Sequence, residues 1–125
     1  MTQRLAFIVE DSVDLAEIFA EALMAAGFTT EIIARGDRAL ARLVTTVPDI
    51  VLLDMHLPGA SGERILRRIR ADERLAKTRV MIASADDAIA EGLREQVDLT
   101  LLKPISYTQL RDLAARLLKE MDDAQ

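Results

Sequence analysis

Polar residues follow directly on short apolar runs at four places in this 125-residue chain. They are three acids, a hydroxyl and an ammonium: Glu10, Asp11, Asp54, Ser84 and Lys103. If the apolar runs are strands of one open parallel sheet, these residues lie along the edge where such folds bind ligands. Carboxylates suit a hard divalent cation, and a hydroxyl and an ammonium can hold phosphoryl oxygens. The pattern therefore predicts a site for a divalent cation and a phosphoryl group.

A carboxylate such as Asp54 can attack phosphorus and form an aspartyl phosphate when a cation offsets the repulsion between the two anions. Mg²⁺ suits this task because it takes one or two carboxylates together with phosphate oxygens and keeps several waters. We expect Mg²⁺ at Asp11 and Asp54, with Glu10 behind them or acting through water. The backbone carbonyl of His56 is expected to be a further ligand, whereas the His56 side chain is interpreted as a turn residue near the mouth of the site.

The same residues have plainer explanations when each is taken alone. The pair Glu10 and Asp11 could serve only to stabilise the positive, N-terminal end of a helix dipole, and Asp54 could be a turn former. Ser84 could be a helix N-cap and Lys103 an ordinary surface lysine. Their joint placement after four different apolar runs favours the site. There Lys103 would pair with one phosphoryl oxygen and Ser84 would donate a hydrogen bond to another.

Five predicted strands must position these residues. The strands are short runs rich in Val, Ile and Leu, at about 4–9, 29–33, 49–54, 79–84 and 98–103. Segments with helical period lie between and after them, at 12–26, 36–46, 61–73, 86–94 and 106–121. This alternation predicts an α/β fold with a doubly wound parallel sheet. Continuous rather than alternating strand hydrophobicity agrees, because helices then cover both faces of the sheet.

Turn and capping residues support these boundaries. Gly27 is expected to end the first helix, Pro48 to separate the second helix from the third strand, and the capping-box pattern at 106–109 to open the last helix. The helix at 86–94 has few apolar anchors, and we expect it to be the most mobile. The tail at 120–125 is expected to fray.

Composition bounds the class of protein. A chain of 125 residues, half of them hydrophobic, predicts one domain spanning 1–125, with no room for an output domain. A net charge of −5 and an aromatic content of 3% without Trp disfavour nucleic-acid binding, which needs clustered cations and stacking platforms. The basic stretch 64–70 lies amid acids on one predicted helix and is interpreted as a solvated face rather than a partner contact.

The absence of Cys excludes a disulfide framework and a thiolate metal site. The apolar run after the N-terminus is too short for a signal peptide, and no apolar stretch approaches membrane-spanning length. The sequence therefore predicts a soluble cytoplasmic protein with no membrane contact.

Four segments resemble the receiver domain of two-component response regulators, and the resemblance covers essentially the whole chain. They are Ile8–Asp11, Ala34–Leu40, Asp49–Gly62 and Leu101–Pro104. The resemblance implies a flavodoxin-like (βα)5 fold with sheet order 2-1-3-4-5. It also implies a phosphorelay, in which a sensor histidine kinase or a histidine phosphotransfer protein supplies the phosphoryl group. A separate downstream effector protein would read the modified surface, and the oligomeric state is left open.

In terms of residues, the resemblance implies that Asp54 accepts the phosphoryl group while Glu10, Asp11 and Asp54 hold Mg²⁺. Lys103 would sense the new charge. Ser84 would swing toward the phosphoryl oxygens and shift the loop and helix that follow it. Slow self-dephosphorylation by water is also implied, although the protein would not be an enzyme.

The resemblance carries further expectations and some departures. The Lys103–Pro104 bond is expected to be cis. The family commonly has Tyr or Phe where this chain has Thr100, so the usual aromatic rotamer switch cannot operate. Glu10 stands where Asp is commoner, and Ala60 replaces a frequent Met, which we interpret as a packing change.

Two alternatives from other functional classes stay open. The first is a receiver-like scaffold that binds its partner without phosphorylation, which the missing aromatic at Thr100 favours. The second is a Mg²⁺-dependent phosphatase or phosphotransferase that uses Asp54 as a catalytic nucleophile. Such enzymes typically place a second acid two residues after the nucleophile, where this chain has His56, and no phosphate-cradling glycine-rich loop follows the first strand.

Overall fold

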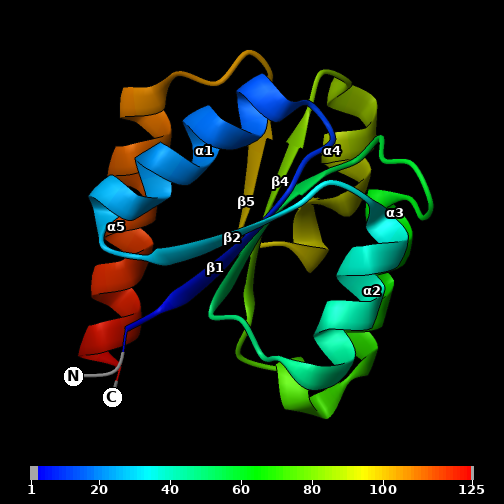
Figure 1. Ribbon diagram of the computed structural model, residues 1–125, viewed down its shortest axis with the longest axis horizontal. Helices are drawn as coiled ribbons and strands as arrows, with labels where there is room; N and C mark the ends of the chain where they lie inside the picture. The colour runs from blue at the N-terminus through cyan, green and yellow to red at the C-terminus, as the bar shows by residue number, and fades with distance from the viewer. Residues whose placement is uncertain (1–2, 125) are drawn as a thin grey trace.

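The computed structural model describes residues 3–124 as five strands and five α-helices in alternation (Figure 1). The strands are β1 (Leu5–Val9), β2 (Thr29–Ile33), β3 (Ile50–Asp54), β4 (Arg79–Ser84) and β5 (Leu99–Leu102). The helices are α1 (Val13–Ala26), α2 (Gly36–Thr45), α3 (Gly62–Ala71), α4 (Asp87–Leu93) and α5 (Tyr107–Asp123), with short 3-10 helices η1 (Glu73–Leu75) and η2 (Arg94–Gln96). Within 3–124, no helix is long and apolar enough to cross a membrane.

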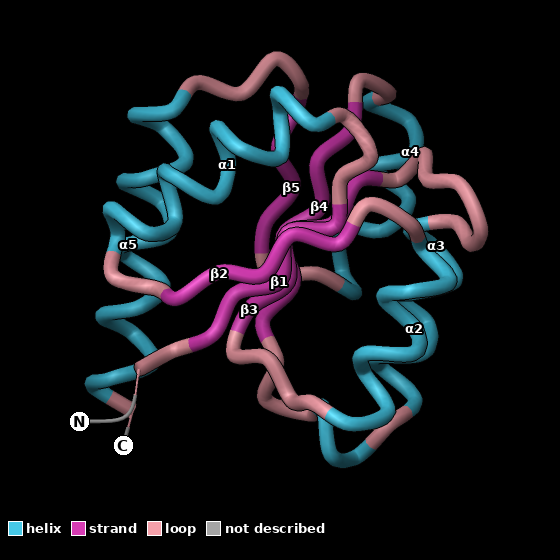
Figure 2. Tube along the Cα trace, viewed as in Figure 1, coloured by secondary structure: helices cyan, strands magenta, loops and turns pink. Residues whose placement is uncertain are grey.

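All five strands are parallel and lie in the order β2-β1-β3-β4-β5 (Figure 2), which confirms the predicted sheet. The register aligns the strand ends. Val9 of β1 lies opposite Leu53 of β3, and Asp54 lies opposite Ala83 of β4. The residues that follow β1, β3 and β4 therefore emerge at one edge of the sheet.

Helices cover both faces of the sheet, α1 and α5 on one side and α2, α3 and α4 on the other (Figures 1 and 2). Side chains alternate between the two layers along β1. Ala6 and Ile8 pack with α1 and α5, whereas Phe7 and Val9 pack with the other three helices. Because both faces of a strand are buried, its sequence is a continuous apolar run.

Serine side chains fix the starts of three helices. Ser12, Ser61 and Ser106 each accept a hydrogen bond from the backbone N–H three residues further on, which satisfies one free donor of the first turn. The last of these is the expected N-terminal signal of α5. Gly27 ends α1 with a φ of 117°, a left-handed conformation that suits glycine, as expected from the sequence.

The two weaker predicted segments differ in outcome. Helix α4 forms, but it has only seven residues before the chain tightens into η2. The tail expected to fray is helical through Asp123 in the structure, with Met121 buried, and Gln125 lies outside the described residues; fraying of this end stays a prediction. Asp122, in the last turn of this helix, has a partner near the start of the chain.

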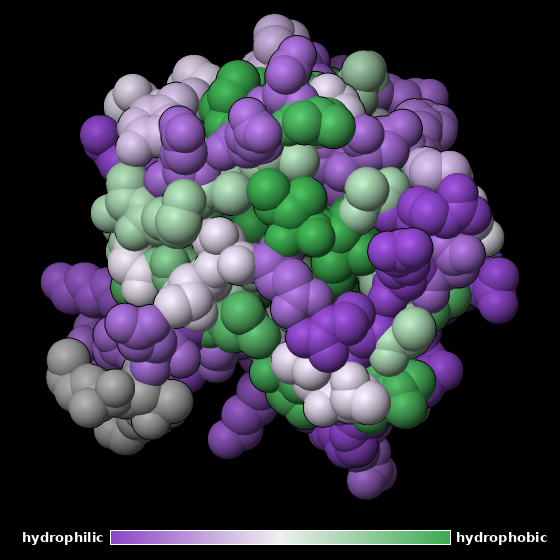
Figure 3. Space-filling view, in the orientation of Figure 1, coloured by the Kyte–Doolittle hydropathy of each residue, from purple (hydrophilic) through white to green (hydrophobic). Residues whose placement is uncertain are grey.

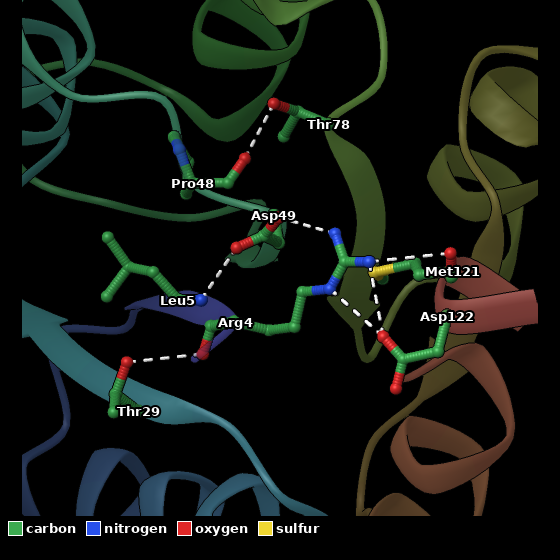
Figure 4. Close-up of polar contacts among 8 residues, drawn as sticks. All are labelled: Arg4, Leu5, Thr29, Pro48, Asp49, Thr78, Met121 and Asp122. Carbon is green, nitrogen blue, oxygen red and sulfur yellow. Dashed lines mark hydrogen bonds and ion pairs between the residues drawn. The ribbon is translucent and has the colours of Figure 1, made fainter. Parts of the chain in front are cut away.

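That partner is Arg4, which precedes β1 (Figure 4). Its guanidinium lies 3.2 Å from a carboxylate oxygen of Asp122 and 3.2 Å from one of Asp49, and it also donates to the carbonyl of Met121. Asp49 in turn accepts a hydrogen bond of 2.7 Å from the N–H of Leu5. This Arg4 clamp joins the starts of β1 and β3 to the end of α5.

Candidate functional site

Three carboxylates gather at the edge where β1 and β3 end. Glu10 follows β1 and is 3% exposed, Asp54 ends β3 and is 6% exposed, and Asp11 is exposed to solvent. One carboxylate oxygen from each lies within 4.8 Å of the others. The structure thus brings together the three predicted acidic residues, with an open side toward solvent at Asp11.

Lys103 provides the positive charge beside them. Its Nζ lies 2.9 Å from Oε1 of Glu10 and 3.3 Å from Oδ1 of Asp54. The bond that follows, Lys103–Pro104, is cis, as predicted. The N–H of Lys103 donates to the carbonyl of Ser84 at 2.8 Å, which joins the chain after β5 to the end of β4. One ammonium beside three carboxylates leaves an excess of negative charge, which a cation would balance.

Burial and charge shift the pKa values of the buried Glu10 and the half-buried Lys103 in directions that follow from these contacts. Burial raises the pKa of the Glu10 carboxyl, and the charge of Asp54 adds to the rise, while hydrogen bonds from Lys103 and the Ser12 N–H oppose it. Burial by itself would lower the pKa of Lys103. Its hydrogen bond to Glu10 and the charges of both carboxylates outweigh burial, so the pKa of Lys103 is raised and its ammonium persists.

Ser84 ends β4 next to Ala83, the residue opposite Asp54, and is buried. Its hydroxyl accepts a hydrogen bond of 3.0 Å from the N–H of Asp86 and donates one of 3.3 Å to the Asp86 carbonyl. The hydroxyl is therefore bonded within its own β4–α4 turn. To donate to a phosphoryl oxygen, the hydroxyl would have to give up its bond to the Asp86 carbonyl, and the swing of Ser84 stays a prediction.

His56 lies in the loop after Asp54, and its side chain is exposed. Its N–H lies 3.5 Å from Oδ1 of Asp54, at the limit of a hydrogen bond. The placement agrees with a turn residue at the mouth of the site. The role of its carbonyl as a metal ligand stays a prediction.

Glycines shape the loop that follows Asp54, a role that sequence reasoning missed although they lie within the quoted segments. A Cβ at Gly62 would meet the backbone carbonyl of Asp54, and one at Gly36 would meet the backbone of Ala60. Gly59 has a φ of 87°. The sequence held a signal for these roles, because Gly36 and Gly62 stand beside polar residues at helix starts and Gly59 follows Pro58 in a turn.

The donor set can hold a hard metal ion. All three side chains offer oxygen atoms, two are held by short buried strands, and the third stands at the solvent-facing side. This combination suits a cation that binds carboxylate oxygens and keeps some waters.

Comparisons with known proteins agree with this geometry. The sequence model of the response regulator receiver domain matches residues 6–115. The DNA-binding response regulator MtrA of Mycobacterium tuberculosis (strain ATCC 25618 / H37Rv) is 34% identical over 125 residues, covering 98% of this chain and 54% of MtrA. The phosphate regulon transcriptional regulatory protein PhoB of Rhizobium meliloti (strain 1021) is 32% identical over 115 residues, covering 90% of this chain and 51% of PhoB. The chain therefore spans about half the length of these relatives.

Solved structures show the same flavodoxin-like architecture. A CheY-like receiver domain from Methylobacillus flagellatus has a TM-score of 0.81 at 28% identity, covering 93% of this chain and 99% of that one. The chemotaxis response regulator CheY4 of Vibrio cholerae has a TM-score of 0.83 at 20% identity, with the same coverage, and so shows the fold alone. From the matched family model, the identity with these relatives and the shared fold, the chain belongs to the response regulator receiver domain family.

Proposed function

We propose that this receiver domain accepts a phosphoryl group on Asp54 from a phosphohistidine, with Mg²⁺ at the carboxylates, and that the modification changes a partner-binding surface. The donor would be a sensor histidine kinase or a histidine phosphotransfer protein. One observation carries the proposal: the buried Asp54 carboxylate lies beside Glu10 and Asp11, within 4.8 Å, and beside the ammonium of Lys103 at 3.3 Å.

The transfer balances with these groups. An oxygen of Asp54 attacks phosphorus, the new O–P bond forms and the P–N bond breaks, and the electron pair stays on the imidazole nitrogen. Mg²⁺, when bound, offsets the negative charge shared between the carboxylates and the phosphoryl oxygens. Glu10, Asp11 and Asp54 supply oxygen ligands for it, with the carbonyl of His56 as the further predicted ligand. Slow attack by water would reverse the modification.

The contacts at Lys103 and Ser84 support a switch. New phosphoryl oxygens would compete with Glu10 for the Lys103 ammonium, and they would offer Ser84 an acceptor in place of the Asp86 carbonyl. Because the Ser84 hydroxyl is bonded to the residue that caps α4, its rotation would release the start of that helix. Thr100 takes the place of the usual aromatic, so the β4–α4 turn would carry the response.

The partners remain part of the proposal. We propose that the modified surface is read by a separate effector protein, that the protein works in the cytoplasm, and that the domain itself does not contact nucleic acid. MtrA is described as DNA-binding, but this chain spans only 54% of its length.

The test is phosphorylation by acetyl phosphate with Mg²⁺, followed by intact mass, with an Asp54→Asn variant and a chelated sample beside it. We expect a gain of one phosphoryl group that requires both Asp54 and the metal. If no adduct forms, and beryllofluoride also leaves the amide spectrum unchanged, phosphorylation is not the switch. The scaffold alternative, which Thr100 favours, would then stand.

A further inference from the structure

The outer edge of β2 carries backbone groups that are free to pair. The N–H of Thr29 donates to the carbonyl of Arg4 at 2.8 Å, and the carbonyl of Ile33 accepts from Glu10 at 3.1 Å, so these alternate residues face β1. In a parallel ladder the residues between them point the other way. The N–H and C=O groups of Thr30 and Ile32 therefore point away from the sheet, and β2 pairs with β1 alone within 3–124.

This edge lacks the devices that usually protect one. Edge strands are commonly blocked by lysine, proline or a bulge. The segment Thr29–Ile33 has no lysine or proline, and its one charged residue, Glu31, is held by Arg42 through bonds of 2.6 and 2.7 Å. Ile32 is 45% exposed. An unprotected edge with an exposed isoleucine is a ready template for another strand.

A groove of about 420 Å³ runs beside the edge of β2. Its lining combines apolar residues with three arginines and one glutamate, whose charge is paired with Arg42: Glu31, Ile32, Ile33, Ala34, Arg35, Arg38, Ala41 and Arg42. Figure 3, in the orientation of Figure 1, shows hydrophobic residues in the middle of the face that is turned to the viewer, with hydrophilic residues beside them. The groove therefore offers apolar contact together with positive charge.

The charge is unevenly distributed around this edge. Residues 35–79 contain ten Lys or Arg and six Asp or Glu, whereas residues 5–34 contain six Asp or Glu and no Lys or Arg. Arg35 pairs with Asp37 and Arg42 with Glu31, but no carboxylate of residues 3–124 lies within 4.0 Å of the guanidinium of Arg38. The α2 side of the groove is therefore positive and has an arginine available for an anionic side chain.

Charge also decides against a second copy of the chain as the occupant. Antiparallel pairing of two β2 edges would place the two-fold axis perpendicular to the joined sheet. Each helix would then lie on the same face as its own counterpart, with basic α2 beside basic α2 and acidic α1 beside acidic α1. Like charges side by side oppose this assembly.

We propose that the edge of β2 binds an extended segment of a partner protein as a sixth strand, in which acidic residues alternate with apolar ones. Glu31 contacts Arg42 of α2, so side chains of the added strand on that face would meet the arginines, while Ile32 belongs to the other face of the sheet. The acidic residues of the added strand would face Arg38 and Arg35, and the apolar ones would cover Ile32. This mode of recognition uses main-chain bonds for affinity and alternate side chains for specificity. It does not depend on phosphorylation of Asp54.

The test uses the unphosphorylated, ¹⁵N-labelled protein and a capped peptide of sequence Thr-Val-Glu-Val-Glu-Val-Thr, titrated to millimolar concentration. We expect the largest amide shifts in β2, and hydrogen exchange at Thr30 and Ile32 slowed by about tenfold or more near saturation. The comparison peptides replace both Glu with Lys, or consist of Glu alone. The proposal is overturned if the amides of β2 do not respond, or if either comparison peptide binds equally well.

Two variants locate the contact. Ile32→Lys places a charge on the edge and Arg38→Glu reverses the groove's available charge, so each should weaken binding by about tenfold or more. The matched controls are Val47→Lys, at a 51% exposed residue after α2, and Arg64→Glu, on the exposed side of α3. All four positions are exposed, so the fold should persist. Equal losses in variants and controls would contradict a site at β2.

Discussion

The residues around Asp54 form a site whose negative charge is only partly balanced. Glu10 and Asp54 are both buried, and they share the single ammonium of Lys103, while Asp11 adds a third carboxylate nearby. Burying charge is costly unless it is paired. The site therefore holds an electrostatic repulsion that a bound cation would relieve.

Replacing Asp54 by Asn should lower the pKa of Glu10, because the charge of Asp54 is one of the causes that raise it. The raised pKa means that Glu10 binds its proton more tightly in the folded chain than in the unfolded one. Its contribution to the free energy of unfolding is therefore present below the ordinary carboxyl pKa and is lost as pH rises through the raised value. The variant should reduce this pH dependence.

The measurement is a carbon-detected NMR titration of the Glu10 carboxyl in metal-free protein. Asp37→Asn is the control, since Asp37 is exposed and pairs with Arg35 at the start of α2. An unchanged Glu10 titration in the Asp54 variant would show that the two carboxylates do not interact.

The sequence predicted which residue types meet at this site, but not which bonds they make. Strand ends determine that Lys103 and Ser84 arrive at the same edge as Asp54. They do not determine that Lys103 lies nearer to Glu10 than to Asp54, or that the Ser84 hydroxyl is bonded to Asp86. Those choices depend on side-chain rotamers, and rotamers depend on neighbours from distant parts of the chain.

At the scale of elements, α4 is the helix whose sequence offers the fewest apolar residues for packing against the sheet, which is why we expect it to be the most mobile. It has seven residues, and only Ala90 and Leu93 among them are buried. Its start is held by Asp86, whose carboxylate accepts from the N–H groups of Ala88 and Ile89 at 2.9 and 3.3 Å. A short helix with a single capping residue depends on that cap.

Asp86→Ala should therefore destabilise α4 by about 1 kcal/mol, the usual cost of losing an N-cap. Native-state hydrogen exchange should show faster exchange across α4, while α1 exchanges as before. Asp87→Ala is the control, because Asp87 lies in the first turn without capping the helix. Equal effects of the two substitutions would assign the loss to charge near the helix start rather than to the cap.

Element existence was predictable because strands buried on both faces are continuous apolar runs, as at 49–54. Element ends were less predictable. Helix α5 extends to Asp123, and Asp122 in its last turn contacts Arg4 at 3.2 Å, a pairing that no local pattern predicts because the two residues are 118 positions apart. The sheet order implied by the family resemblance made β2 an edge strand, but the sequence did not show that this edge would be unprotected, since that depends on which side chains lie beside it.

At the scale of the whole molecule, the Arg4 clamp holds three elements together at the end of the sheet opposite the acidic site. The Arg4 side chain is 17% exposed and pairs with both Asp49 and Asp122. It precedes β1, whereas Glu10 follows the same strand. Loss of a mostly buried cation leaves its carboxylate partners unbalanced.

Arg4→Met should lower the free energy of unfolding by about 2 kcal/mol, because the aliphatic stem is kept but both ion pairs are lost. Urea denaturation measures the change, with Arg116→Met, at an exposed residue of α5, as the control. The acidic site should still bind metal in this variant. A loss no larger than that of the control would show that water replaces the clamp without cost.

The clamp also brings two residues that are far apart in the sequence, Arg4 and Asp122, into direct contact. Since the side chains of Arg4 and Asp122 touch, a linker between these two positions should be short, and we expect that the chain could then be reopened at a surface loop. Arg4 precedes β1 and Glu10 follows it, so this change would lie a full strand length from the carboxylates. A circularly permuted form of this domain, opened at a surface loop on the Arg4 side, is therefore expected to keep the acidic site, which lies at the opposite end of β1.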